Sequence, residues 1–290
     1  MARNNKGRTK RAAPPAESTA ITAETAGAQN AASTGLSYVV PTEFVELPSQ
    51  GRYYPEGHAL SGQEVVEIRH MTAKDEDILT SRSLLKKGLA IDRLIQNLLV
   101  DKTIDVNSLL VGDRNAILIQ TRIHAYGPDY ITRSICPSCG DVSESTFNLL
   151  EVENDTGEWA DMNVDGPTEQ GTFIVALPKT GLPVEVRLMN GHDEKHALKI
   201  IENRKKNKLA ETSVTSQMKQ YIVSIDGHTN RSEINKFVDN MPTLDAQYLR
   251  VAYNALVPNV DMALPFRCAE CETESRLEVP FTADFFWPNR

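Results

Sequence analysis

Cys136-Pro-Ser-Cys139 and Cys268-Ala-Glu-Cys271 decide how this chain folds, and they contain all four of its cysteines. Two cysteines in a C-x-x-C turn can offer two thiolates to one metal ion, and two such turns supply a closed tetrahedral site. Cysteines that serve only as buried apolar residues are the alternative, but they need no such spacing. The pattern therefore predicts one structural zinc ion per chain, bound by Cys136, Cys139, Cys268 and Cys271. Because four thiolates leave no position for water or substrate, this zinc would stabilise structure without performing a reaction.

The two cysteine pairs lie 132 residues apart, from position 136 to position 268, and other features repeat at the same distance. The same offset relates Asp113 to Asp245, Asp129 to Asp261, and Ser143 to Ser275. The segments Val66-Glu-Ile-Arg69 and Val184-Glu-Val-Arg187 match at a shorter offset of 118. We interpret the pattern as an internal duplication, with chance similarity between two α/β segments as the alternative.

The predicted fold class is α+β, with two duplicated strand-plus-helices units joined by a split four-cysteine zinc ribbon. Each unit ends in one zinc knuckle, so the metal would hold the two units together. The predicted boundaries are a disordered tail over residues 1–36, a first unit over 37–152, an acidic linker over 153–171 and a second unit over 172–290. The tail is predicted to be disordered because it has too few large apolar residues to form a core.

Hydrophobic periodicity and end signals predict the main elements of each unit. A strand is expected over 65–69, followed by one helix from Thr72 to Gly88 and an amphipathic helix over 89–99. Asp113 is predicted to be the N-cap of a helix that ends near Tyr126, and Asp245 to cap a helix that ends near Pro258.

The charge distribution limits the possible partners. Residues 1–36 carry five basic and two acidic side chains, a balance of +3, so the net charge of −8 leaves −11 for the rest of the chain. An acidic body is unsuited to gripping a nucleic-acid backbone. The alternative is a zinc-ribbon nucleic-acid-binding protein whose basic cluster touches phosphates, through Arg3, Lys6, Arg8, Lys10 and Arg11. The sequence also lacks a membrane span and a secretory signal, so we expect a cytoplasmic protein without membrane partners.

No catalytic or cofactor-binding motif is recognisable, and the predicted protein is not an enzyme. His192 and His196 have the i, i+4 spacing of a metalloprotease helix, but Asp193 stands where that motif requires glutamate. Two aromatic clusters fit either core packing or a protein interface, namely Tyr53-Tyr54-Pro55 and, near the C-terminus, Phe281 with Phe285-Phe286-Trp287-Pro288.

Several motifs together resemble one known family, the baseplate proteins of T-even-type contractile-tail bacteriophages, counted among the hub or hub-assembly subunits. The resemblance covers residues 40–290. It rests on both C-x-x-C pairs and on five motifs: Leu47-Pro-Ser-x-Gly51 with Tyr54-Pro-x-Gly57, Val66-x-Ile-Arg-x-Met71-Thr-x-x-Asp75-Glu, Leu110-Val-Gly-Asp113-Arg and Tyr126-Gly-Pro-Asp-Tyr130.

This resemblance implies a non-enzymatic late protein that is made in the cytoplasm of an infected bacterium and acts in assembly of the central tail hub. Its implied partners are other baseplate or hub proteins and the tape-measure protein. The resemblance leaves open whether the protein remains in the virion tail baseplate or acts only during assembly.

Overall fold

The computed structural model describes residues 39–207, 213–279 and 283–286. The predicted disordered tail with its basic cluster lies outside these residues, as do Phe281 and Trp287 of the C-terminal aromatic cluster. The described residues form helices and small antiparallel sheets, which confirms the α+β class.

The first half of the chain begins with the antiparallel strands β1 (Thr42–Glu46) and β2 (Val65–Arg69), so the predicted strand over 65–69 is confirmed. Four apolar side chains of the loop between them are buried, namely Leu47, Tyr53, Tyr54 and Leu60. The loop therefore packs into the core. Of the two alternatives for Tyr53 and Tyr54, core packing or a protein interface, the structure favours core packing.

The helices of the first half are α1 (Ala73–Thr80), α2 (Arg82–Lys86), α3 (Ala90–Leu98) and α4 (Val111–Tyr126). The prediction of a single helix from Thr72 to Gly88 is wrong, because Ser81 has an extended backbone and separates α1 from α2. Serine favours helix caps over helix interiors, which suits this break. The predicted amphipathic helix is confirmed as α3, whose Leu94, Ile95 and Leu98 are fully buried.

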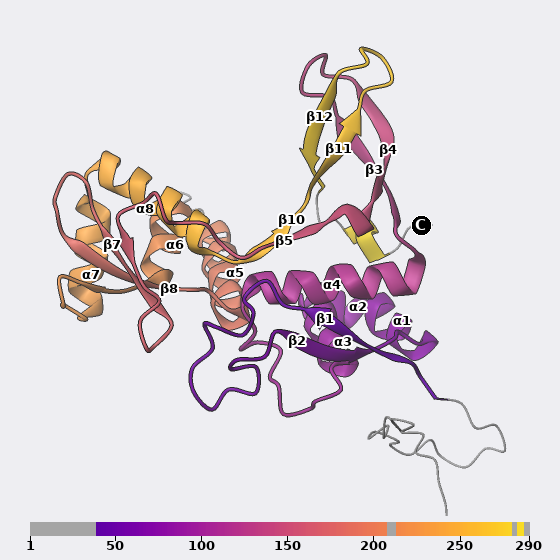
Figure 1. The fold of residues 1–290 in the computed structure, drawn as a ribbon, viewed down its shortest axis with the longest axis horizontal. Coiled ribbons are helices and arrows are strands. Elements are labelled where there is room, and N and C mark those ends of the chain that lie inside the picture. Colours follow the sequence, from indigo (N-terminus) through magenta and orange to yellow (C-terminus); the bar gives the residue numbers. More distant parts are fainter. Residues whose placement is uncertain (1–38, 208–212, 280–282, 287–290) are drawn as a thin grey trace, which may run out of the picture. The chain divides into compact units, whose positions relative to one another are not determined.

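Two β-hairpins follow the long helices of the two halves. One consists of β3 (Asp129–Ile135) and β4 (Val142–Asn148), and the other of β11 (Ala263–Arg267) and β12 (Glu274–Glu278). Figure 1 shows the two hairpins side by side, with the short antiparallel pair β5 (Glu153–Asp155) and β10 (Asn259–Asp261) near their base. Two 3-10 turns complete this region, η1 (Leu149–Glu151) and η2 (Ala283–Phe286).

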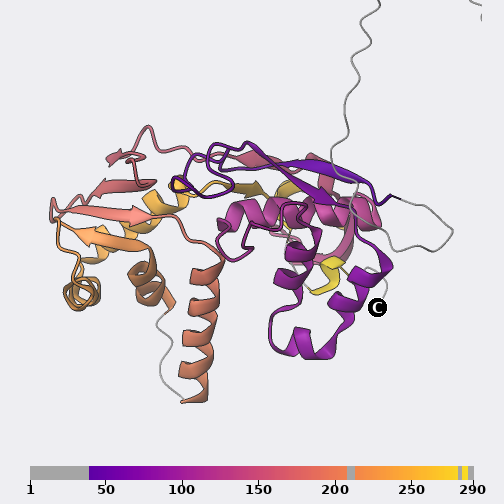
Figure 2. The same cartoon turned by 90° about the horizontal axis from the view of Figure 1, so that it is seen from below.

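The second half contains an antiparallel sheet of four strands in sequence order, β6 (Val164–Asp165), β7 (Thr172–Ala176), β8 (Pro183–Arg187) and β9 (Ile222–Ile225). Its helices are α5 (Gly191–Lys206), α6 (Ser213–Tyr221), α7 (Arg231–Asn240) and α8 (Thr243–Leu256). Figure 2 shows α5 extending away from the strands of this sheet. Within the described residues, no helix is both long and apolar enough to cross a membrane.

Residues 153–171, for which the sequence predicts an acidic linker, contain β5 and β6. Trp159 in this segment meets the ring of Phe173 edge-on, with 5.3 Å between ring centroids. The unit boundaries at 152 and 172 stay predictions.

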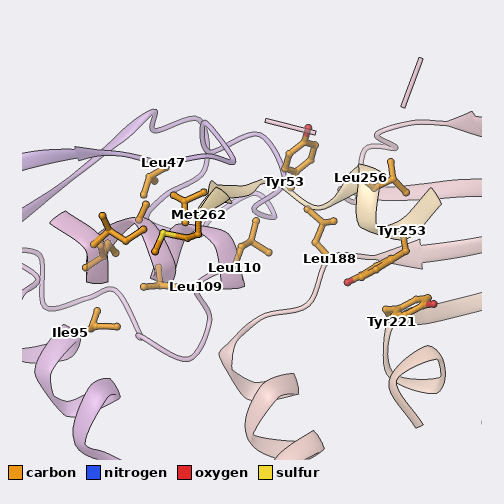
Figure 3. Close-up of a cluster of buried hydrophobic side chains, with 14 of the residues drawn as sticks. Leu47, Tyr53, Ile95, Leu109, Leu110, Leu188, Tyr221, Tyr253, Leu256 and Met262 are labelled. Carbon is orange, nitrogen blue, oxygen red and sulfur yellow. The ribbon is translucent and has the colours of Figure 1, made fainter. Parts of the chain in front are cut away.

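Buried apolar side chains from both halves form one continuous core (Figure 3). It runs from Leu47 and Ile95 to Tyr221 and Tyr253, whose rings stack with centroids 3.9 Å apart. Phe285 and Phe286 of η2 are also buried in this core, which favours packing over an interface for these two aromatic residues.

Asp113 and Asp245 are not N-caps, so this prediction is wrong. Since α4 begins at Val111 and α8 at Thr243, each aspartate is the third helical residue, and both are fully buried. A carboxylate is favourable in a first helical turn, where the backbone amides and the helix dipole are positive. Their oxygens accept hydrogen bonds from distant loops, which the sequence pattern did not indicate.

The loop that binds Asp113 is the Leu47-Pro-Ser-Gln-Gly51 segment of the first half. Asp113 accepts hydrogen bonds from the Ser49 amide (3.0 Å), the Ser49 hydroxyl (2.6 Å) and the Tyr54 hydroxyl (2.6 Å). In the second half, Asp245 accepts from the amides of Lys179 (2.7 Å) and Thr180 (3.1 Å), in the matching Leu177-Pro-Lys-Thr-Gly181 segment. Each aspartate thus joins the long helix of its half to a loop between two paired strands, β1 and β2 in the first half and β7 and β8 in the second.

A second pair of contacts is shared by the two halves. Arg69 binds Asp75 through two hydrogen bonds of 2.7 and 2.8 Å, and Arg187 binds Asp193 through two of 2.6 Å. Each pair joins the end of a strand to the first turn of the helix that follows. Bidentate arginine–carboxylate pairs are strong and geometrically specific.

The Arg69–Asp75 pair predicts a loss of stability in acid. Burial alone would raise the pKa of Asp75, but hydrogen bonds from Arg69 and Thr72 and the Arg69 charge lower it to about 2. A carboxyl with a lowered pKa in the folded state stabilises the protein above its unfolded pKa, near 4, and loses this effect as the pH falls towards 2. The excess stability of the wild type over Asp75→Asn should therefore shrink between pH 4 and pH 2, as measured by urea unfolding. Asp77→Asn, on the exposed face of the same helix, serves as control and should show no such trend.

Candidate metal centre

Each C-x-x-C segment forms the turn of a hairpin, and the two turns have the same hydrogen bonds. In the first, the Cys136 amide donates to Asp141 O (2.9 Å) and the Gly140 amide to Cys136 O (2.9 Å). In the second, the Cys268 amide donates to Thr273 O (3.0 Å) and the Glu272 amide to Cys268 O (3.1 Å). The residue after the second cysteine has a left-handed backbone in both turns, with φ of +75° at Gly140 and +56° at Glu272. Glycine adopts this conformation without strain, whereas glutamate does so at a cost.

The two turns bring all four cysteine sulfurs together. Cys136 Sγ lies 3.7 Å from Cys271 Sγ, and Cys139 Sγ lies 3.7 Å from Cys268 Sγ. All four sulfurs are within 4.8 Å of one another. Zinc–sulfur bonds of about 2.3 Å place tetrahedral thiolates about 3.8 Å apart, so the arrangement fits one ion. A disulfide would require a separation of about 2.0 Å, and all four cysteines are free.

Burial and hydrogen bonding differ among the four thiols. Cys136 and Cys268 are buried, while Cys139 and Cys271 are exposed. Hydrogen bonds from the side chain and backbone of Thr273 lower the pKa of Cys271 to about 6. The Asp141 amide lowers the pKa of Cys139, but hydrogen bonding with Cys271 and desolvation outweigh it and raise that pKa to about 12. Without a cation the cluster therefore retains thiol protons, and a bound metal would release them.

A family model described as T4 bacteriophage base plate protein matches residues 42–287. The chain belongs to this family. The match contains both hairpins and all four cysteines, and it confirms the resemblance to T-even-type baseplate proteins. Searches of curated proteins and of solved structures returned no match.

Membership identifies a T4-type phage baseplate protein, and its family is one of structural tail components. A baseplate protein has other baseplate proteins as its partners and its place in the virion tail. These statements follow from the family and not from the cysteine cluster.

His192 and His196 lie on the exposed side of α5, and His192 Nε2 is 3.4 Å from Asp105. Neither belongs to a metal-competent group within the described residues. Besides the four cysteines, the described residues contain one other such group, Glu43, His70 and His124. It comes from three separate elements, so no local sequence signal identifies it.

Proposed function

We propose that this protein is a non-enzymatic structural or assembly component of the central hub of the baseplate and acts through protein–protein contacts. Membership in the baseplate family supports this role. The acidic body, with a balance of −11 outside residues 1–36, suits protein partners better than nucleic acid.

The proposal includes one structural zinc ion held by Cys136, Cys139, Cys268 and Cys271. The observation that carries it is the convergence of the four sulfurs within 4.8 Å, from turns that lie 132 residues apart in sequence. When bound, the ion would supply a cross-link between the two hairpins, because each hairpin contributes two thiolates. Four thiolates would complete its coordination and leave no site for catalysis.

An internal duplication is part of the same proposal. It is supported by the paired contacts of the two halves: the Arg69–Asp75 and Arg187–Asp193 pairs, the buried Asp113 and Asp245, and the two cysteine turns. On this view each unit ends in half of the zinc ribbon, and neither unit can close the site alone.

The hub role predicts a specific defect in phage assembly. A nonsense mutation in the gene of the phage that encodes this protein should prevent the formation of infectious particles, because tails cannot be completed without a baseplate hub. Electron microscopy of the lysate should show filled heads and incomplete baseplates, and wild-type protein supplied from a plasmid should restore infectious particles.

Cross-linking mass spectrometry of purified baseplate assemblies would then identify the partners. Cross-links to central hub proteins or to the tape-measure protein would support the hub role, whereas cross-links confined to peripheral baseplate proteins would contradict it. Normal infectious particles from the mutant phage would refute a required assembly role.

Salt-sensitive retention on DNA or RNA, which weakens steeply from low to physiological salt, would favour the nucleic-acid-binding alternative.

A further inference from the structure

A second group of metal-binding side chains lies apart from the cysteines, where β1, β2 and α4 meet. Glu43 is on β1, His70 follows the last residue of β2, and His124 is in the last turn of α4. One ligand atom from each residue lies within 4.8 Å of the other two. We propose that these three residues form a second metal site, which takes a divalent transition-metal ion such as zinc.

The backbone holds these side chains in place independently of any ion. β1 and β2 pair in register, with Glu43 opposite Ile68, and the His70 amide donates to Pro41 O (2.9 Å) to extend the pairing. His124 is carried by the 16-residue helix α4, which is anchored at its other end by the buried Asp113. A site built on strands and a long helix needs little reorganisation to bind an ion.

The side chains already converge on one point. The Glu43 carboxylate contacts His124 Nε2, and the rings of His70 and His124 have centroids 4.7 Å apart. The Gln120 amide nitrogen lies one turn before His124, 3.3 Å from Glu43 Oε2 and 2.8 Å from His124 Nε2. It positions the Glu43 carboxylate, and a bound ion would replace it at the imidazole nitrogen. Tetrahedral metal bonds of about 2.1 Å place ligand atoms about 3.4 Å apart, so adjustments of about 1.5 Å or less would complete the site.

Glu43 supplies a separate indication that a cation belongs here. Its Oε1 is buried and has no hydrogen-bond partner within the described residues. An unsatisfied buried carboxylate oxygen is unfavourable, and a bound cation compensates it. Two imidazoles and one carboxylate are also a ligand set that zinc uses when it keeps a fourth position open. This position could accept water or a side chain of a neighbouring protein.

The test measures how many Zn²⁺ ions bind to the full-length protein, prepared without an affinity tag. Protein that holds one zinc equivalent in its cysteine site is titrated with Zn²⁺ by isothermal titration calorimetry. We expect one further equivalent to bind to the wild type. The double variant His70→Ala/His124→Ala should weaken this second event by about 100-fold or more, because two of three ligands are lost.

The matched control is His192→Ala/His196→Ala, which removes two exposed imidazoles from α5 and should retain the second equivalent. Glu43→Gln preserves the shape of the side chain without its charge, and it should lose Zn²⁺-dependent thermal stabilisation while circular dichroism shows an intact fold. No second equivalent in the wild type would overturn the proposal. Loss of the second zinc equivalent in the His192→Ala/His196→Ala variant would also overturn the proposal. So would retention of the second equivalent in both the His70→Ala/His124→Ala and the Glu43→Gln variants.

Discussion

Replacing Cys268 with serine should abolish zinc binding at the cysteine site and loosen both hairpins, not only the one that carries the substitution. Each hairpin supplies half of the ligands, so the loss of one thiolate removes the cross-link from both. The contact between Cys139 and Cys268 spans 129 residues, and a cross-link over a loop of about 100 residues is worth about 4–5 kcal/mol in unfolding free energy. We expect a loss of this size on urea unfolding. Elemental analysis should find about one zinc ion per chain fewer in Cys268→Ser than in the wild type.

Hydrogen exchange would show where the structure opens. Amides of β3–β4 and of β11–β12 should both exchange faster in Cys268→Ser. Ser138→Ala changes an exposed side chain in the first turn without removing a thiolate, and it should retain zinc and wild-type protection. Faster exchange restricted to β11–β12 would show that the hairpins are independent. Freshly reduced wild-type protein without zinc at the cysteines would refute the site itself.

Substituting Asp113 with alanine should cost about 3 kcal/mol of unfolding free energy, since hydrogen bonds to a charged group are among the stronger ones. Three donors lose their acceptor: the amide and hydroxyl of Ser49 and the hydroxyl of Tyr54. Ser49 is completely buried, so water cannot replace the lost contacts without local opening. Urea unfolding monitored by circular dichroism measures the effect.

Asp245→Ala is the matched control, because Asp245 has the corresponding place in the second half. Its two amide donors belong to Lys179 and Thr180, whose exposed loop allows partial hydration, so the loss should be smaller. Asp113→Asn should also be milder than Asp113→Ala, because the hydroxyls of Ser49 and Tyr54 can turn to accept from the new amide. If Asp113→Ala and Asp245→Ala both lose little unfolding free energy, and lose equal amounts, then Asp113 does not hold the loop that contains Ser49.

Local sequence signals were sufficient where the physical cause is local. The strand over 65–69 alternates burial along its own residues, and α3 presents an apolar face at helical spacing. The C-x-x-C turns depend on two cysteines and one left-handed residue within five positions, as seen at Gly140 and Glu272. Such features can be predicted without knowledge of the partner segment.

Long-range contacts were missed or misassigned because their partners lie far away in sequence. Asp113 is a residue type that is common at helix caps. It becomes a buried hydrogen-bond acceptor only because Ser49, 64 residues earlier, lies next to it in the fold. Arg122 is almost completely buried, and its guanidinium donates to the carbonyl oxygens of Phe285, Gly127 and Asp129. Nothing near Arg122 in the sequence indicates that one of its partners is 163 residues away.

The sequence alone determined that four cysteines form two turns of the same kind, and that these turns end two similar stretches of chain. It also contained the motifs that identify the baseplate family. The cysteine pattern predicted a shared site, but only the tertiary structure decided that the four sulfurs lie within 4.8 Å of one another and that Glu43, His70 and His124 gather at a second point. The reason is physical: residue spacing sets the geometry within a turn, whereas the packing of separate elements sets the distance between turns.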